Sequence, residues 1–109
     1  MTKEPGFGAV APVLACTDVL ATAHWYRDVL GFSLDDEYTS EAGGMLWAEV
    51  RQIFLSRRPD LVKTAKGQEI LIGCRDVDAV HARHQLKGAN IVSPLQTQPW
   101  GLREYTVED

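Results

Sequence analysis

One heptapeptide pattern occurs twice in this chain, and the repeat limits the folds that the chain can adopt. VLACTDV stands at residues 13–19 and LIGCRDV at residues 71–77, 58 residues later in a chain of 109 residues. Cys, Asp and Val keep their places in both copies. In each copy a short apolar stretch is closed by an Asp at the sixth position, a residue type that commonly caps the first turn of a helix. The sequence therefore predicts a tandem repeat of one β-α-β-β type of unit.

The residues around the two copies predict similar elements in the same order. After Asp18, apolar residues recur every three or four positions up to Leu30, which predicts a helix that ends at Gly31. After Asp76, a second helix is predicted to end at Gly88. The predicted strands are 9–16, 32–38, 43–50 and 52–57 in the first unit, and 69–76, 90–96 and 102–108 in the second.

These elements predict one α+β domain, residues 1–109, with a first module at 9–60 and a second module at 66–109. The polar residues at 61–68 are predicted to form an irregular linker between the modules. Pro94 predicts that its strand lies at the edge of a sheet, because proline has no N–H to donate to a ladder. The second module has one strand fewer than the first, so the repeat predicts that its final strand is missing.

Composition and charge exclude several classes of protein. Hydrophobic residues make up 45% of the chain and charged residues 24%, and the net charge is −4, which argues against a nucleic-acid partner. No apolar run reaches the roughly 18 residues that span a bilayer. The first ten residues lack the apolar core of a signal peptide, so a cytoplasmic location is expected. Two cysteines do not make a disulfide framework.

Three segments resemble one known family. DVLATAHWYRDVLGF, DVDAVHARHQLKGA and QPWGLREYTVED are similar to segments of the glyoxalase/bleomycin-resistance/dioxygenase superfamily, also called vicinal oxygen chelate, and most of all to its bleomycin-resistance-like branch. The resemblance implies tandem βαβββ modules that form a cupped mixed sheet, an intimate homodimer, and a ligand cavity in each cup. Family chains continue after the final Asp of this pattern with another strand, so the final strand is again expected to be missing here.

The resemblance also allows a test of the metal site that enzymes of the superfamily use. Their first-strand ligand stands seven residues before the capping Asp, which corresponds to Ala11 and Glu69 here. Ala11 has no donor atom. Glu69 could bind a hard cation, but a solvated strand start is the preferred interpretation, and a third ligand position lies beyond Asp109. We therefore expect no metal and no cofactor, with Glu69 as the one candidate ligand.

The histidines and cysteines are expected to have structural roles. His24 lies off the apolar stripe of its helix and is predicted to be at the surface. His81 and His84 share a helix face that is expected to point away from the cup, and His84 is predicted to be a partly buried, hydrogen-bonded core residue. Strand parity places Cys16 and Cys74 on the helix side of their strands, so both are predicted to be small core residues.

A cup without metal would bind its ligand through apolar contact and a few polar groups. The candidate ligand-binding residues are Tyr38, Trp47, Glu49, Phe54, Trp100, Arg103 and Tyr105. Trp100 could instead cap the core. The acidic residues Asp35, Asp36, Glu37, Glu41 and Glu49 cluster around the second and third strands. They could form a solvated edge, or they could attract a cationic ligand.

Three functions are compatible with these residues. The leading interpretation is a non-catalytic protein that sequesters an antibiotic-like, aromatic or cationic small molecule in a cleft at a homodimer interface. The alternative is a metal-dependent enzyme of the superfamily, such as a glyoxalase-like lyase, an isomerase, an extradiol dioxygenase or a thiol transferase acting on an antibiotic. The third is a structural domain with a vestigial cup. Neither a nucleic-acid nor a membrane partner is expected.

Overall fold

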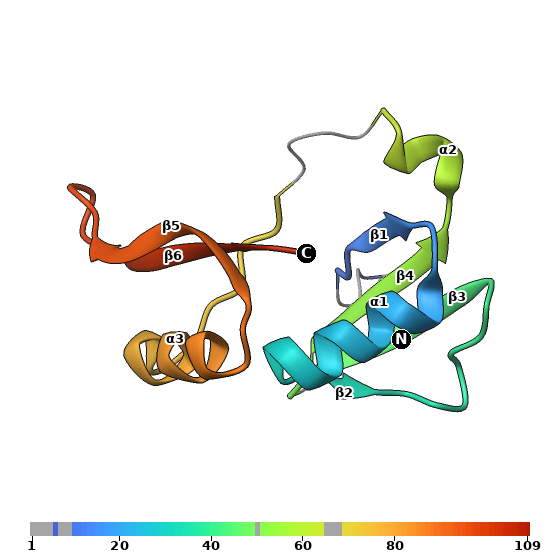
Figure 1. Ribbon diagram of the computed structural model, residues 1–109, viewed down its shortest axis with the longest axis horizontal. Coiled ribbons are helices and arrows are strands. Elements are labelled where there is room, and N and C mark those ends of the chain that lie inside the picture. The colour runs from blue at the N-terminus through green and yellow to red at the C-terminus, as the bar shows by residue number, and fades with distance from the viewer. Residues whose placement is uncertain (1–5, 7–9, 50, 65–68) are drawn as a thin grey trace, which may run out of the picture.

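The computed structural model describes residues 6, 10–49, 51–64 and 69–109, and Figure 1 shows them as two groups of elements. The first module contains β1 (Val13–Cys16), α1 (Val19–Trp25), the π-helical turn η1 (Tyr26–Leu30), β2 (Ser33–Leu34), β3 (Gly43–Ala48), β4 (Arg51–Arg57) and α2 (Pro59–Val62). The second module contains α3 (Val77–Leu86), β5 (Asn90–Thr97) and β6 (Arg103–Glu108). Helices and strands are mixed in both modules, so the predicted α+β class is confirmed.

The two repeated Asp residues begin the two main helices in the same way. The Asp18 carboxylate accepts a hydrogen bond from the Ala21 N–H at 3.0 Å, and the Asp76 carboxylate accepts one from the Ala79 N–H at 3.1 Å. Each bond satisfies an N–H group that has no partner within its helix. The first helix also ends as predicted, at Gly31, whose φ of 89° is easily adopted by glycine.

The strands form two sheets whose pairing follows the repeat only in part. In the first module the strand order is β1-β4-β3-β2, with β1 parallel to β4 and the other pairs antiparallel. In the second module β5 pairs with β6 in an antiparallel hairpin. Pro94 lies in β5, which forms an edge of this two-stranded sheet among the described residues, and the register shifts on either side of Ser93.

The predicted strand at 69–76 is not a strand in this structure. These residues have no ladder partner among the described residues, and the Leu71 side chain is 85% exposed. In the first module the corresponding strand β1 is held by β4, and no strand of the described second module occupies the equivalent place. A short apolar stretch forms a strand only where another strand can complete its hydrogen bonds.

Other predicted boundaries also differ from the structure. The strand predicted at 32–38 shortens to β2, because the chain turns after Asp35, whose carbonyl accepts from the Tyr38 N–H at 3.3 Å. The predicted linker begins inside a short helix, α2, which has Pro59 in its first turn. Residue 9, Val50 and residues 65–68, which belong to predicted strands and to the predicted linker, lie outside the described residues.

The hydrophobic core of the described residues lies in the first module, between α1 with η1 and one face of the sheet. Leu46 and Ala23 are fully buried there and Val19 is 1% exposed. In the second module the one buried side chain among the described residues is His84. The exposed large apolar side chains there are Ile70, Leu71, Ile72, Leu86, Val92, Trp100 and Leu102. None of the described helices combines the length and the apolar character that a membrane crossing requires.

The two cysteines have different environments, although strand parity predicted that each would face the helix side of its own strand. Cys16 is buried, its thiol lies 3.6 Å from the Ser56 carbonyl oxygen, and burial raises its pKa. Cys74 is exposed. The prediction of a core residue is therefore confirmed for Cys16 and wrong for Cys74, because residues 69–76 are not packed as a strand.

This difference predicts unequal effects of the same substitution. Cys16→Ala should lower the free energy of unfolding by about 1–2 kcal/mol, because it removes a buried sulfur atom. Cys74→Ala is the matched control and should change it by less than about 0.5 kcal/mol. Urea denaturation of both variants measures these values. Equal losses for the two variants would contradict the assignment.

Candidate functional site

An aromatic surface lies on the face of the first sheet that is turned away from α1. Leu46 and Ile53 pack in the core beneath the helix. Because side chains alternate along a strand, Met45, Trp47 and Phe54 point to the opposite face. All three are half-buried, and Met45 and Phe54 are direct partners across β3 and β4. We call these three residues the aromatic face.

A carboxylate borders the aromatic face. The Trp47 indole N–H donates to the Asp35 carboxylate at 3.4 Å, and the Gln52 side-chain amide donates to the Met45 sulfur at 3.4 Å. Asp36 and Glu37 follow in the exposed turn. The aromatic face therefore offers an apolar surface with negative charge at one edge, which is a suitable surface for a cationic aromatic molecule.

Two further predicted residues lie near this sheet but outside the aromatic face. Tyr38 is 62% exposed in the segment that connects β2 to β3. Glu49 follows β3 with a φ of 59°, an uncommon value for a residue with a side chain. Its carboxylate pairs with Arg75 at 2.5 Å, with both side chains mostly exposed. Such an exposed pair contributes little stability, but it joins the end of β3 to the segment before α3.

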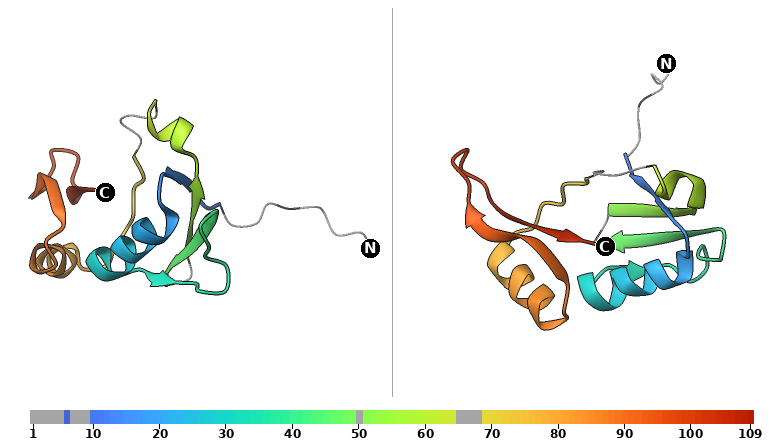
Figure 2. Two further views of the ribbon diagram at one scale, coloured as in Figure 1. Left: turned by 45° about the vertical axis from the view of Figure 1, so that its right-hand side comes forward. Right: turned by 45° about the horizontal axis from the view of Figure 1, so that its top comes forward.

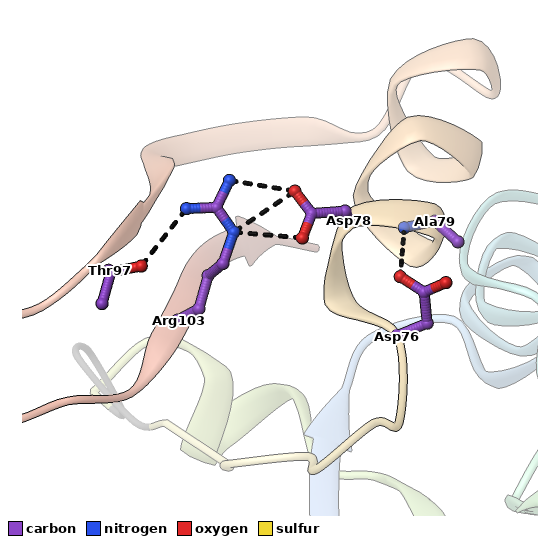
Figure 3. Close-up of polar contacts among 5 residues, drawn as sticks. All are labelled: Asp76, Asp78, Ala79, Thr97 and Arg103. Carbon is purple, nitrogen blue, oxygen red and sulfur yellow. Dashed lines mark hydrogen bonds and ion pairs between the residues drawn. The ribbon is translucent and has the colours of Figure 1, made fainter.

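Figure 3 shows that Arg103 is engaged by helix α3. Its guanidinium donates from Nε and Nη2 to the Asp78 carboxylate, at distances between 2.9 and 3.2 Å, and from Nη1 to the Thr97 hydroxyl at 3.4 Å. The hydrogen bonds from Arg103 hold the pKa of Asp78 below its usual value. The structure thus directs this predicted ligand-binding cation toward the helix side of β6.

Tyr105 also points toward α3. Its hydroxyl lies 2.5 Å from His84 Nδ1, and its ring packs edge-on against His81 with a centroid distance of 4.7 Å. His84 Nε2 lies 2.9 Å from the Leu30 carbonyl oxygen. A carbonyl only accepts, so Nε2 carries the hydrogen, and in the neutral ring Nδ1 accepts from Tyr105.

This network explains why a histidine is buried in the second module. Both ring nitrogens of His84 have partners, and the side chain is 7% exposed, as the predicted hydrogen-bonded core residue requires. His84 connects α3 to the last turn of η1, so it joins the two modules. A second connection is the Tyr26 hydroxyl, which donates to the Asp109 carboxylate at 2.9 Å. The sequence could not identify these partners, because they are far apart along the chain.

The remaining candidate, Trp100, is exposed. Trp100 lies in the turn between β5 and β6 and is 66% exposed. A bond of 2.9 Å from the Gly101 N–H to the Gln98 carbonyl closes this turn, and Gly101 has a φ of 94°. The alternative that Trp100 caps the core does not agree with this exposure. Figure 1 places the turn at the far end of the hairpin, away from the first sheet.

The structure therefore brings together only part of the predicted set. Trp47 and Phe54 share one face, whereas Arg103 and Tyr105 turn toward α3. By alternation, the side chains on the other face of β6 belong to Glu104, Thr106 and Glu108. The sequence did not determine which alternate side chains of β6 face α3. One known contact between β6 and α3 would have determined the direction of all of them.

The residues at the superfamily's metal-ligand positions do not fit a metal ion. Ala11 has no donor atom, and Glu69 is exposed at the beginning of the unpaired segment. Among the described residues, no group of three or more His, Cys, Asp or Glu side chains is arranged to hold a metal ion. We derive no chemistry through a metal at these positions.

Solved structures of similar fold cover nearly the whole chain. The bleomycin-binding protein of Streptomyces verticillus, in complex with copper(II)-bleomycin, superposes with a TM-score of 0.80 and 23% identity, over 97% of this chain and 90% of that chain. TioX from Micromonospora sp. ML1 has a TM-score of 0.71 and 31% identity, over 94% and 87%. The bleomycin resistance determinant of transposon Tn5 has a TM-score of 0.77 and 18% identity, over 93% and 88%.

The family comparison agrees with the fold. No curated protein sequence matches the chain significantly. Residues 7–109 match the family described as Glyoxalase/Bleomycin resistance protein/Dioxygenase superfamily. Because this match extends over nearly all of the sequence, the chain belongs to the Glyoxalase/Bleomycin resistance protein/Dioxygenase superfamily.

Proposed function

We propose that this protein binds and sequesters a flat, aromatic, cationic small molecule of the antibiotic type, without transforming it. The observation that carries the proposal is the aromatic face. Trp47 and Phe54 remain half-exposed on a sheet whose other face packs against α1 and η1. A large aromatic surface left open to water favours a ligand or a partner that covers it.

Charge supports a cationic ligand. Asp35 accepts from the Trp47 indole, and Asp36 and Glu37 are exposed beside it. The whole chain carries a net charge of −4. A cation that lies over an aromatic ring near carboxylates is attracted both by the π-electrons of the ring and by the negative charge of the carboxylates. Two of the similar solved structures are bleomycin-binding proteins in complex with copper(II)-bleomycin and with bleomycin, which makes bleomycin the first probe to use.

A second copy of the chain is part of the proposal. The aromatic face is an open sheet surface, and the second module leaves several apolar side chains exposed, including Leu71, Trp100 and Leu102. In a homodimer, the second module of one copy would close the aromatic face of the other, so that each cleft lies at the interface. We place this activity in the cytoplasm, where such a ligand would act on its targets.

Titration with bleomycin tests the proposal. We expect saturable quenching of tryptophan fluorescence, one bleomycin per chain by calorimetry, and a dimer by light scattering at micromolar concentration. The melting temperature should rise with bleomycin concentration, because the ligand binds the native state. EDTA should leave the affinity for metal-free bleomycin unchanged.

Two results would reject the proposal. If neither bleomycin nor other cationic aromatic antibiotics bind at millimolar concentration, the aromatic face is not such a site. If the purified protein retains one divalent ion per chain and this ion is required for turnover of a substrate, the metal-dependent enzyme is the correct function.

A further inference from the structure

A groove lies between α3 and β5, apart from the aromatic face. Figures 1 and 2 show α3 along one face of the β5–β6 hairpin. The groove has a volume of about 610 Å³, within the range of small-molecule sites. Residues of α3 and of β5 line it: His81, Gln85, Ile91, Val92, Pro94 and Leu95. None of them belongs to residues 70–74 or to β6, so a strand placed between those two segments would not fill the groove.

The corresponding positions of the first module are packed. The repeat relates His81 to Ala23 and Val92 to Leu34. Ala23 is fully buried and Leu34 packs against the core, whereas His81 is half-buried and Val92 is 49% exposed. Of the two related pairs of a helix and an edge strand, the second therefore keeps side chains accessible where the first buries them.

Irregularities of β5 shape the wall of the groove that this strand forms. The register between β5 and β6 shifts between Ile91 and Ser93, and again between Ser93 and Gln96. Such irregularities change the direction of side chains along a strand, and they are common next to functional sites. Regular alternation would send Pro94 and Leu95 to opposite faces, but both line the groove here. The wall formed by β5 is therefore continuous and apolar.

The wall formed by α3 supplies the polar groups. His81 and Gln85 are four residues apart, so they lie on one face of the helix. The His81 ring packs edge-on against Tyr105, whose hydroxyl is held by His84 Nδ1 at 2.5 Å. A neutral imidazole has one donor nitrogen and one acceptor nitrogen, and a glutamine side chain offers both kinds of group. This wall therefore suits a hydroxyl group, which both donates and accepts.

The lining residues also favour an uncharged ligand. None of the six carries a carboxylate, an ammonium or a guanidinium group. A charged ligand would lose hydration in the groove without gaining an ion partner there, which costs free energy. An aromatic ring, in contrast, would cover the apolar wall of β5 at no such cost.

We propose that the groove binds an uncharged phenolic small molecule. Its ring would lie against the apolar wall of β5, and its hydroxyl would reach His81 and Gln85. The second module already contains one pairing of a phenol with an imidazole, between Tyr105 and His84. The groove is separate from the aromatic face and takes a different class of ligand, so this proposal does not rest on the proposed function.

Nuclear magnetic resonance of methyl-labelled protein reports where a phenol binds. We expect p-cresol to shift the methyl resonances of Ile91, Val92 and Leu95 saturably, with a dissociation constant in the millimolar range or tighter. Toluene lacks the hydroxyl, and 4-methylbenzoate has a carboxylate in its place. Each of these two should bind tenfold or more weakly than p-cresol, because the first leaves His81 and Gln85 without a partner and the second brings an unpaired charge.

Variants of α3 test the polar wall. His81→Phe keeps a ring against Tyr105 and removes both ring nitrogens, so it should abolish the preference for p-cresol over toluene. Gln85→Ala changes an exposed side chain to a good helix former, so it remains decisive if His81→Phe fails to fold. It should weaken p-cresol binding about threefold and leave toluene binding unchanged. His24→Phe, at an exposed position of α1, is the matched control and should keep the preference.

Several results would overturn the proposal. One is the absence of methyl shifts at millimolar p-cresol, and another is equal affinity for p-cresol and toluene. A preference that persists in both His81→Phe and Gln85→Ala, or shifts at Met45 instead of at β5, would count equally against it. N-acetyltyrosinamide carries the same phenol on a peptide backbone and should bind more weakly than p-cresol. Equal or tighter binding would assign the groove to a tyrosine of a partner protein instead of a small molecule.

Discussion

Leu46→Ala should lower the free energy of unfolding by about 3 kcal/mol, within the range measured for buried leucines. Leu46 is fully buried in the middle of β3 and belongs to the core formed with Val19 and Ala23 of α1. A domain of this size is stable by only about 5–15 kcal/mol. The substitution should therefore remove a large share of the stability, which urea denaturation followed by circular dichroism measures directly.

Leu86→Ala is the matched control for this change. Leu86 is 84% exposed at the end of α3, so the same loss of side-chain atoms should change the free energy of unfolding by less than about 0.5 kcal/mol. Comparable losses for Leu46→Ala and Leu86→Ala would mean that the second module packs as tightly as the first. That result would contradict the placement of the core in the first module.

Trp100→Ala should weaken the affinity for bleomycin tenfold or more and change the melting temperature little. Trp100 is 66% exposed in a turn fixed by Pro99 on one side and closed by Gly101 on the other. A rigid aromatic ring in such a turn can stack on a ligand for about 0.5–1.5 kcal/mol beyond its buried area. This prediction assumes the dimeric cleft of the proposed function, and calorimetry with a thermal melt measures both quantities.

The quenching of tryptophan fluorescence by bleomycin identifies which tryptophan contacts the ligand. Trp25→Phe is the control, because Trp25 packs edge-on against Tyr26 on the helix side of the sheet, at a centroid distance of 5.1 Å. Its removal should leave the affinity unchanged. A large loss of stability in Trp100→Ala, with unchanged affinity per folded molecule, would assign Trp100 to packing. If Trp47→Phe removes the quench instead, the ligand lies on the aromatic face alone.

The sequence by itself determined the features that depend on interactions between residues close together in the chain. Helix capping depends on an Asp and on N–H groups within three residues of it, so Asp18 and Asp76 predicted both helix starts. Parity along β1 placed Cys16 against the core, because alternation is a property of the strand alone. The segments that resemble the family are also short and contiguous in the sequence, and they identified the superfamily whose model matches residues 7–109.

Only the tertiary structure decided the features that depend on a partner far along the chain. The same parity gave a wrong position for Cys74, because residues 70–74 pair with no strand among the residues that the structure describes. The direction of Arg103 was fixed by Asp78, 25 residues away, and the burial of His84 by the Leu30 carbonyl, 54 residues away. A side chain's face follows from its own strand, but whether that strand exists follows from the hydrogen bonds that another strand supplies.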